Sequence, residues 1–363
     1  MSRRSTRYVK AALSAMHYSG ADGLLSPLTR GVGAILTLHQ VEPESAGEFS
    51  PNRILRITPY FLERTINQLL EAGFDCVSMD EVAERVANPG RYERPFVAFT
   101  LDDAYRDNLV HAQPVFQRYG VPYCIYAPTD FLDGNGDLWW LTLEHAIAAY
   151  DVVEVEIDGE CLRLPASTCA EKEAAFHRIY WRLREVDETS ARAIVAGLAE
   201  RAGLDHKSIC RNLVMNWAEL RQIAADPLAT IGAHTVRHYA LAKLGSGAAQ
   251  FEIEQSIRRL ADGLGRKVEH FSYPFGDRTS AGPREFEMVR ALGMKTAVTT
   301  RKGLLRSGDD LDPVALPRLS LNGDYQDPLY TKVLLSGLPF ALLDLARRVV
   351  PQGLMGGASR PSA

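Results

Sequence analysis

The chain of 363 residues is long enough for one large domain with an insertion, or for two domains. Its formal net charge of -4 and its 24% of charged residues are ordinary for a soluble protein and give no basic excess that would favour nucleic-acid binding. The five cysteines are odd in number and scattered, which predicts neither a disulfide framework nor a cysteine-rich metal site and fits a reducing compartment.

Residues 1–30 are expected to form an N-terminal helical segment. Basic side chains precede a short apolar run over 11–16, and the run is broken at His17. A secretory signal needs an apolar run of about 7–15 residues. We therefore expect a short amphipathic helix and a cytoplasmic protein, with a signal peptide or targeting segment as the alternative.

An apolar run from Gly33 to Leu38 predicts the first strand, and His39 follows it directly. A histidine in this place is either an ordinary loop residue or a polar group at the mouth of a site. Residues 58–73 have apolar side chains at helical spacing, a proline near the start and a glycine at the end, and predict an outer helix.

The run from Phe96 to Leu101 predicts a strand buried on both faces, and Asp102 and Asp103 follow it. Ligands bind at the carboxyl ends of parallel strands, so two carboxylates here could hold a cation. Alternatively they only cap the helix predicted over 108–119. A strand over 121–127 comes next, and this alternation indicates parallel pairing and a barrel.

The alternation stops between residues 133 and 228, where we expect a mostly helical insertion. A hairpin is predicted over 152–164, followed by helices over 170–184, 188–202 and 217–225. Trp139 and Trp140 could stack on sugar rings, since aromatic faces pack well against pyranose rings, or they could pack the insertion on the barrel.

A strand over 229–233 is followed by His234 and His238. Two imidazoles four residues apart lie on one face of a helical turn, and both can bind a metal. With one carboxylate they would make three protein ligands and leave positions open for water and substrate, as catalytic metal sites do. Histidines also occur at this spacing by chance.

Further alternation of helix and strand is predicted up to residue 319. Residues 333–350 are apolar but contain charged side chains, and are too polar for a membrane-spanning helix. We expect that the segment 326–363 contains an amphipathic helix that packs on the barrel or a partner, or that lies in a membrane interface. The tail after Pro351 is expected to be disordered.

Three motifs occur in the order found in the NodB-homology polysaccharide deacetylases, carbohydrate esterase family four. Thr-Leu-Asp-Asp at 100–103, His-Thr-x-x-His at 234–238 and Tyr-Pro-Phe-Gly at 273–276 resemble the first three motifs of that family. The resemblance covers roughly residues 33–321, with a gap in the middle. It implies an α/β fold, a distorted (β/α) barrel of about seven strands formed by 31–132 and 229–325, with 133–228 as the helical insertion.

The resemblance also implies a divalent metal, usually zinc, bound by Asp103, His234 and His238, with Asp102 as the base. In the family, a backbone N–H next to the third-motif proline holds the oxyanion, and here that position matches Phe275. We count Phe275 as a candidate substrate-binding residue, together with Tyr273 and the two tryptophans.

The sequence departs from the family pattern in two places. Ser272 stands where the third motif usually has arginine, and Arg318 stands where the last motif usually has histidine. The usual acid and the usual partner of the base are therefore both absent. We expect Arg318 to pair with Asp102, and His39 to supply the acid, as an early histidine does in relatives that act on poly-N-acetylglucosamine.

These features predict a metal-dependent hydrolase that removes N-acetyl groups from an amino sugar in a polysaccharide, oligosaccharide or lipid-linked glycan. The alternatives are a deformylase or small-amide hydrolase on the same fold, or an inactive carbohydrate-binding homologue. The expected partner is a carbohydrate and not a nucleic acid, with peripheral membrane contact through the C-terminal helix.

Overall fold

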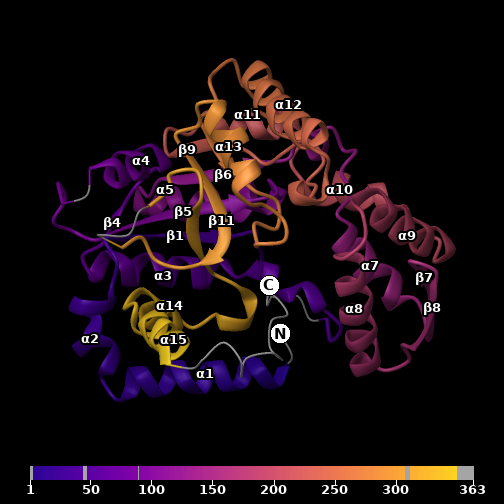
Figure 1. Ribbon diagram of the computed structural model, residues 1–363, viewed down its shortest axis with the longest axis horizontal. Coiled ribbons are helices and arrows are strands. Elements are labelled where there is room, and N and C mark those ends of the chain that lie inside the picture. The colour runs from indigo at the N-terminus through magenta and orange to yellow at the C-terminus, as the bar shows by residue number, and fades with distance from the viewer. Residues whose placement is uncertain (1–2, 44–46, 89, 307–310, 350–363) are drawn as a thin grey trace.

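Seven parallel strands close into a barrel in the computed structural model, which describes residues 3–43, 47–88, 90–306 and 311–349 (Figure 1). The order around the barrel is β1, β12, β11, β10, β9, β6 and β5, and β5 pairs again with β1. A further strand, β4 (Asp75–Cys76), pairs with β5. The predicted α/β barrel of about seven strands is confirmed. The bounds are β1 (Gly33–Leu38), β5 (Phe96–Asp102), β6 (Tyr123–Ala127), β9 (Ala229–Ala233), β10 (His270–Ser272), β11 (Thr296–Lys302) and β12 (Leu316–Ser320).

The barrel strands are apolar because both of their faces are covered. Every residue of β1, β5 and β6 is buried, between the barrel interior and a layer of helices. The side chain of Thr58 accepts a hydrogen bond from the N–H of Phe61 and so fixes the start of the first outer helix. The outer helices are α3 (Pro59–Glu71), α4 (Met79–Ala87), a π-helical turn (Asn108–Ala112) that continues into α5 (Gln113–Tyr119), α12 (Ser246–Leu264) and α13 (Pro283–Ala291).

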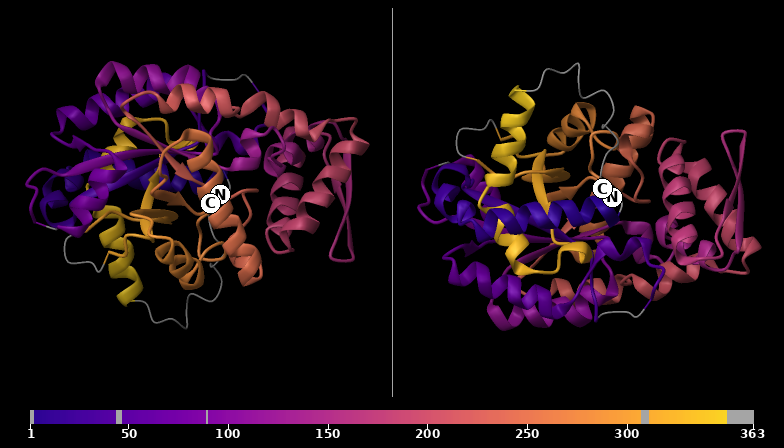
Figure 2. Two further views of the ribbon diagram at one scale, coloured as in Figure 1. Left: turned by 90° about the horizontal axis from the view of Figure 1, so that it is seen from above. Right: turned by 90° about the horizontal axis from the view of Figure 1, so that it is seen from below.

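The residues between β6 and β9 form the helical part on one side of the barrel in Figures 1 and 2. The predicted hairpin is present as antiparallel β7 (Val152–Ile157) and β8 (Glu160–Pro165). One helix in this part, α10 (His206–Leu213), is absent from the prediction, because it is short and mostly polar. The helices are α6 (Thr129–Leu132), α7 (Trp139–Ala148), α8 (Cys169–Leu183), α9 (Glu188–Arg201), α10 and α11 (Trp217–Ala224).

Helices from the two ends of the chain pack together against the barrel (Figure 1). They are α1 (Arg3–Tyr18), α2 (Ala21–Thr29), α14 (Pro328–Leu335) and α15 (Leu338–Val349). The segment expected to contain an amphipathic helix has two helices, α14 and α15, in its described part. The chain turns at Gly337, where φ is 76°, a backbone conformation that ends a helix and favours glycine. The tail expected to be disordered lies outside the described residues.

Within the described part of the chain, no single helix is long and apolar enough to cross a membrane. Together α14 and α15 reach that length and composition, but they are bent by 57° where they meet. Val333 and Leu335 of α14 are buried in the structure. The remaining short elements are β2 (Gln40–Val41), β3 (Arg56–Ile57) and the 3-10 turns at Pro51–Leu55, Leu241–Lys243 and Gly323–Tyr325.

Gly337→Ala should destabilise the protein. A Cβ at this position would lie 1.9 Å from the carbonyl oxygen of Thr29, in a left-handed backbone conformation. We expect the free energy of unfolding to fall by about 2 kcal/mol or more, measured by denaturant unfolding. Gly23→Ala in α2 is the control, because nothing lies within 4 Å of its Cβ position. Equal stability of the two variants would contradict the close packing of this turn.

Candidate metal and catalytic site

The predicted site residues meet at the carboxyl ends of the barrel strands. Asp102 is the last residue of β5 and Asp103 follows it, His234 follows β9, and His39 follows β1. Arg318 reaches the same place from within β12. Parallel strands that share one closed sheet bring their carboxyl ends together, although these residues are spread from position 39 to position 318 of the sequence.

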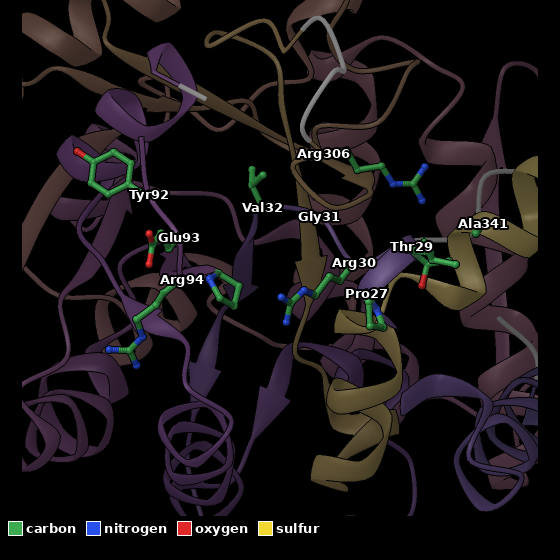
Figure 3. Close-up of a pocket in the computed structure, with 12 residues that line it drawn as sticks. Pro27, Thr29, Arg30, Gly31, Val32, Tyr92, Glu93, Arg94, Arg306 and Ala341 are labelled. Atoms are coloured by element: carbon green, nitrogen blue, oxygen red, sulfur yellow. The ribbon is translucent and has the colours of Figure 1, made fainter. Parts of the chain in front are cut away.

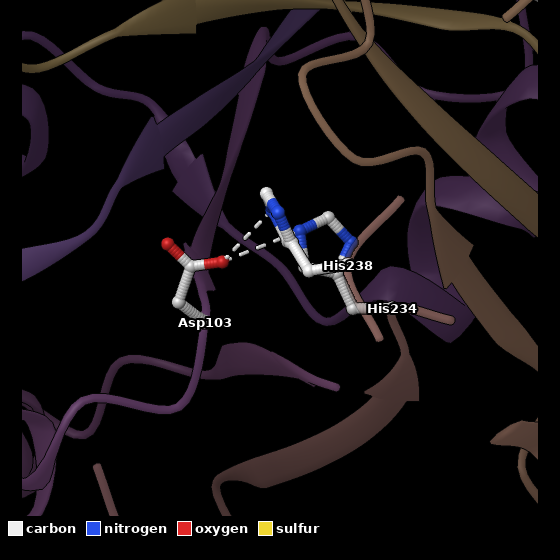
Figure 4. A group of neighbouring side chains, drawn as sticks. All are labelled: Asp103, His234 and His238. Atoms are coloured by element: carbon white, nitrogen blue, oxygen red, sulfur yellow. Dashed lines mark ion pairs between the residues drawn. The ribbon is translucent and has the colours of Figure 1, made fainter. Parts of the chain in front are cut away.

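Asp103, His234 and His238 form one buried group of potential metal ligands (Figure 4). Both Nε2 atoms face the same carboxylate oxygen, Oδ1 of Asp103, at 3.5 Å from His234 and 3.2 Å from His238. That oxygen is buried and has no hydrogen-bond partner in the described part of the chain. A buried carboxylate oxygen without a partner is costly, so the three side chains fit a divalent cation between them.

The neighbours of His234 hold its ring in the orientation that a metal needs. The Nδ1 atom of His234 lies 2.6 Å from the backbone carbonyl oxygen of Ser272. A carbonyl can only accept, so Nδ1 carries the proton and Nε2 is left with a free lone pair. This tautomer is the one that binds a metal through Nε2.

The two histidines do not lie on a helical turn, which corrects the sequence interpretation. Residues 234–238 form a bent loop in which Thr235 has a φ of 64° and His238 a φ of 58°. The buried carboxylate of Glu252 in α12 accepts hydrogen bonds from the N–H groups of Val236 and Arg237. The side chain of Thr235 accepts another from the N–H of His238. These bonds hold both imidazoles toward Asp103.

Left-handed backbone conformations recur around the site. Asp103, Ala104 and Phe275 also have positive φ values of 74°, 53° and 60°. Each such residue costs about 1–3 kcal/mol and persists only where the surrounding contacts impose it. The strain therefore lies where the chain leaves the strands to present the ligands.

Arg318 and Asp102 form the expected ion pair, and it is fully buried. The Nη1 and Nη2 atoms of Arg318 donate to the two carboxylate oxygens of Asp102 at 2.9 Å and 2.6 Å. The other three N–H groups donate to the Thr299 carbonyl and to the hydroxyl groups of Thr100 and Ser272. All five donors of the guanidinium thus have acceptors, which a buried arginine requires.

The charges of the site keep both carboxylates ionised. Burial alone would raise the pKa of Asp102, but the charges of Arg318 and His234 and the hydrogen bonds from Arg318 outweigh it, and the pKa is lowered. Burial is likewise outweighed at Asp103, where His238 and His234 hold the pKa far below its usual range.

His39 lies at the edge of the site, half-buried after β1. Burial lowers the pKa of its imidazole, and Arg318 and His234 lower it further, while Asp103 and Asp102 oppose the change. The imidazole is therefore neutral near pH 7. Its backbone carbonyl accepts a hydrogen bond from Asn108 at 2.8 Å, which fixes the loop that carries it.

The prediction that the two tryptophans form a sugar-stacking platform is wrong, because both side chains are deeply buried. Trp139 and Trp140 are only 3% and 4% exposed. Trp139 stacks on Tyr180 of α8 at 5.0 Å between ring centroids, and Trp140 lies 5.0 Å from the ring of His238. They pack the insertion against the metal-ligand loop, as the alternative interpretation expects.

Tyr273 and Phe275 differ in whether they can contact a substrate. Tyr273 is fully buried and its hydroxyl donates to the carbonyl of Val314 at 2.9 Å. The prediction that this side chain contacts the substrate is therefore wrong. The Phe275 ring lies 4.9 Å from the ring of His238. The backbone N–H of Phe275 donates to no acceptor in the described residues, so it stays a candidate for the oxyanion.

Sequence reasoning missed two arginines from the insertion. Arg192 of α9 donates to the carbonyl of His238 at 2.9 Å. Arg184, just after α8, lies 3.9 Å above the Phe275 ring and pairs with Asp277 at 2.9 Å. On an amphipathic helix these side chains look like any surface arginine, and no spacing marks them.

The comparisons with known proteins relate part of the chain to a known family. The family model described as polysaccharide deacetylase matches residues 188–297, which contain the His234–His238 loop and β10. The matched segment resembles the polysaccharide deacetylases. This match and the shared fold support a hydrolase that acts on amide bonds. No curated protein matches the sequence.

Solved structures of deacetylases have the same fold. The deacetylase PplD from Streptococcus pyogenes is 14% identical with a TM-score of 0.55, over 83% of this chain and 97% of that one. IcaB from Ammonifex degensii is 18% identical with a TM-score of 0.51, over 84% and 97%. The de-N-acetylase from Aggregatibacter actinomycetemcomitans is 14% identical with a TM-score of 0.53, over 83% and 99%.

The ion pair of Arg318 and Asp102 can be tested by Arg318→Met. The variant leaves the Asp102 carboxylate buried without its partner, which should cost about 3–5 kcal/mol in the free energy of unfolding at pH 7. The lowered pKa of Asp102 stabilises the wild-type fold above the ordinary carboxyl pKa of about 4, and this stabilisation is lost as pH falls further. Without Arg318 the carboxyl group of Asp102 protonates at higher pH. The difference in unfolding free energy between the wild type and Arg318→Met should therefore be smaller in mild acid.

Arg301→Met is the control for this experiment. Arg301 lies on the neighbouring strand β11 and makes no ion pair with a carboxylate in the described part of the chain. It should lose less stability and show no comparable pH dependence. A deficit of Arg318→Met that is as large in mild acid as at pH 7 would contradict the proposed charge pairing.

Proposed function

We propose that the protein is a zinc-dependent deacetylase that removes N-acetyl groups from an amino sugar in a polysaccharide, oligosaccharide or lipid-linked glycan. The observation that carries this proposal is the buried group of Asp103, His234 and His238 beside the Asp102–Arg318 pair, at the mouth of a deacetylase barrel. The S. pyogenes deacetylase is a complex with acetate, the acid that such a reaction releases.

The donor set suits zinc. Two imidazole nitrogens and one carboxylate oxygen are ligands that zinc prefers, and three protein ligands leave positions open for water and substrate. When bound, the ion would lower the pKa of its water toward about 7 and polarise the acetyl carbonyl.

Proton transfer is assigned to Asp102 and His39. Asp102 is ionised and accepts the proton of the attacking water, while Arg318 holds both of its oxygens in place. His39 is neutral near pH 7, so its imidazole can act as an acid only after it has taken up a proton from solvent, to which it is partly exposed. It then protonates the leaving amine, a role that Arg318 cannot fill because a guanidinium keeps its protons.

The Phe275 backbone holds the developing oxyanion in this proposal. Its N–H is held in a strained turn at a φ of 60° and its carbonyl accepts from the hydroxyl of Thr300. A fixed donor of this kind favours the charged intermediate over the neutral amide. We also propose a cytoplasmic location, which the five free cysteines favour.

The metal site is tested by His238→Ala. Purified protein should carry about one divalent ion per chain, and the variant should lose most of it, because one of three protein ligands is gone. His145→Ala, a change of an exposed histidine on α7, should keep the metal. Equal metal content of the two variants in elemental analysis would rule out this site.

The catalytic roles are tested by Asp102→Asn and His39→Ala. With added zinc, the wild-type protein should release acetate from N-acetylglucosamine oligosaccharides, and N-formylated sugars should react more slowly. Both variants should keep the metal and lose about 10²-fold or more in turnover, the usual scale for a general base or acid. His145→Ala should keep full activity.

Either variant at near wild-type rate would place that proton transfer on another group. A wild-type protein that binds zinc but hydrolyses none of these substrates would refute the proposed deacetylation. A clear preference for the N-formylated sugars would identify a deformylase instead.

A further inference from the structure

A second pocket lies at the opposite end of the barrel from the metal site. Val32 and Pro95, which line it, directly precede β1 and β5, so the pocket opens at the amino ends of the strands (Figure 3). Its volume is about 360 Å³. The rest of its lining comes from the end of α2, the segment before β5, Arg306 and the start of α15.

The charged side chains around this pocket are mostly cationic. Arg30, Arg94 and Arg306 line it, with Glu93 as the acidic residue among the lining side chains. Arg306 pairs with Asp344 at 3.2 Å and Arg94 with Asp75 at 3.3 Å. Arg30 is exposed and has no ion pair within the described residues. Asp344 and Asp75 thus offset two of the three arginines, and Arg30 is left as the lining cation without a paired carboxylate in the described part of the chain.

Exposed leucines flank the arginines on two neighbouring helices. Leu24 and Leu28 of α2 are 80% and 84% exposed, and they lie one turn apart on one face of the helix. Leu28 also lines the pocket itself. On α15, Leu342, Leu343 and Leu345 are 44%, 54% and 57% exposed, directly after Ala341 in the pocket wall.

The two helices are joined at their ends, and Leu28 of one and Ala341 of the other line the same pocket. The hydroxyl of Thr29 at the end of α2 donates to the carbonyl of Ser336 between α14 and α15 at 2.6 Å. Gly337 packs against the backbone of Thr29 so closely that no side chain fits between them. We call the five leucines and three arginines the leucine-arginine face.

We propose that the leucine-arginine face binds the surface of a bilayer that contains anionic phospholipids. Exposed leucines beside basic side chains are the pattern of helices that lie in a membrane interface, where the apolar side chains enter the acyl boundary. The arginine-lined pocket matches the phosphate of a lipid headgroup, because guanidinium groups recognise phosphate well. Arg30, which has no ion pair in the described residues, offers the first contact for an anionic headgroup.

This docking sets the orientation of the enzyme. The face lies at the amino ends of the barrel strands and the metal site at their carboxyl ends. The active site therefore opens away from the bilayer, toward glycan in the aqueous phase. Membrane contact would hold the protein at a surface without covering its catalytic residues.

Co-sedimentation of the full chain with vesicles tests the proposal without any substrate. The protein should bind vesicles of phosphatidylcholine mixed with phosphatidylglycerol at least about tenfold more strongly than phosphatidylcholine alone. High salt should weaken this binding. Leu24→Ser with Leu28→Ser should lower binding by about tenfold or more, and Arg30→Gln with Arg306→Gln should remove the preference for the anionic lipid.

Phe251→Ser is the matched control, since Phe251 is 51% exposed on α12, away from the face. It should bind as the wild type does, and thermal unfolding should show that all variants are folded. No binding to anionic vesicles, equal binding by the leucine variant, or an equal loss in Phe251→Ser would overturn the proposal. The proposal would also be overturned if the wild-type protein is a dimer in solution and the leucine variant is a monomer, because a second copy would then cover the face. None of these outcomes bears on the deacetylase activity.

Discussion

The buried guanidinium of Arg318 ties together four strands of the barrel. From β12 it binds Thr100 and Asp102 on β5, Ser272 on β10 and the backbone of β11. A charged group enclosed in this way is tolerated only if every donor and every carboxylate oxygen is satisfied. The carboxyl ends of these strands are therefore held in one arrangement. Asp103 follows one of them, β5, and His234 follows β9, which pairs with β10.

The candidate metal ligands depend on a second set of contacts that comes from outside the barrel. Glu252 on α12 holds the loop between His234 and His238 through two backbone N–H groups, and Arg192 from the insertion holds the carbonyl of His238. Trp140 packs on the His238 ring. The insertion is thus part of the site, because it fixes one ligand and covers it.

The sequence predicted the features that local patterns specify. Apolar runs that end in Asp102, His39 or His234 mark buried strands whose polar ends share one edge of the sheet, so the barrel and the group of potential metal ligands could both be expected. The pairing of Arg318 with Asp102 could be expected because a buried carboxylate needs a cation and the usual one is missing. These predictions rest on short motifs and on the alternation of strand and helix.

Other features depend on contacts between distant segments and leave no local pattern. Glu252 and Arg192 have the spacing of ordinary surface residues on amphipathic helices. The histidine pair has the spacing of a helical turn, yet positive φ values at Thr235 and His238 produce a loop. Trp139 and Trp140 look like a binding platform in sequence, and only the packing of the insertion shows that their faces are covered.

The exchange of arginine between two strands explains why Ser272 is small. In the usual family pattern the arginine comes from position 272 and the histidine from position 318. Here Arg318 fills the space beside Asp102, and its Nη2 donates to the hydroxyl of Ser272 at 3.1 Å. A second guanidinium at 272 would place two cations in one buried pocket with one carboxylate between them. The two positions are therefore coupled, and changes at either one would not be additive with changes at the other. Because Arg318 takes the place of the usual acid, an acid for the leaving amine would have to come from another strand, and His39 after β1 is the residue proposed for it.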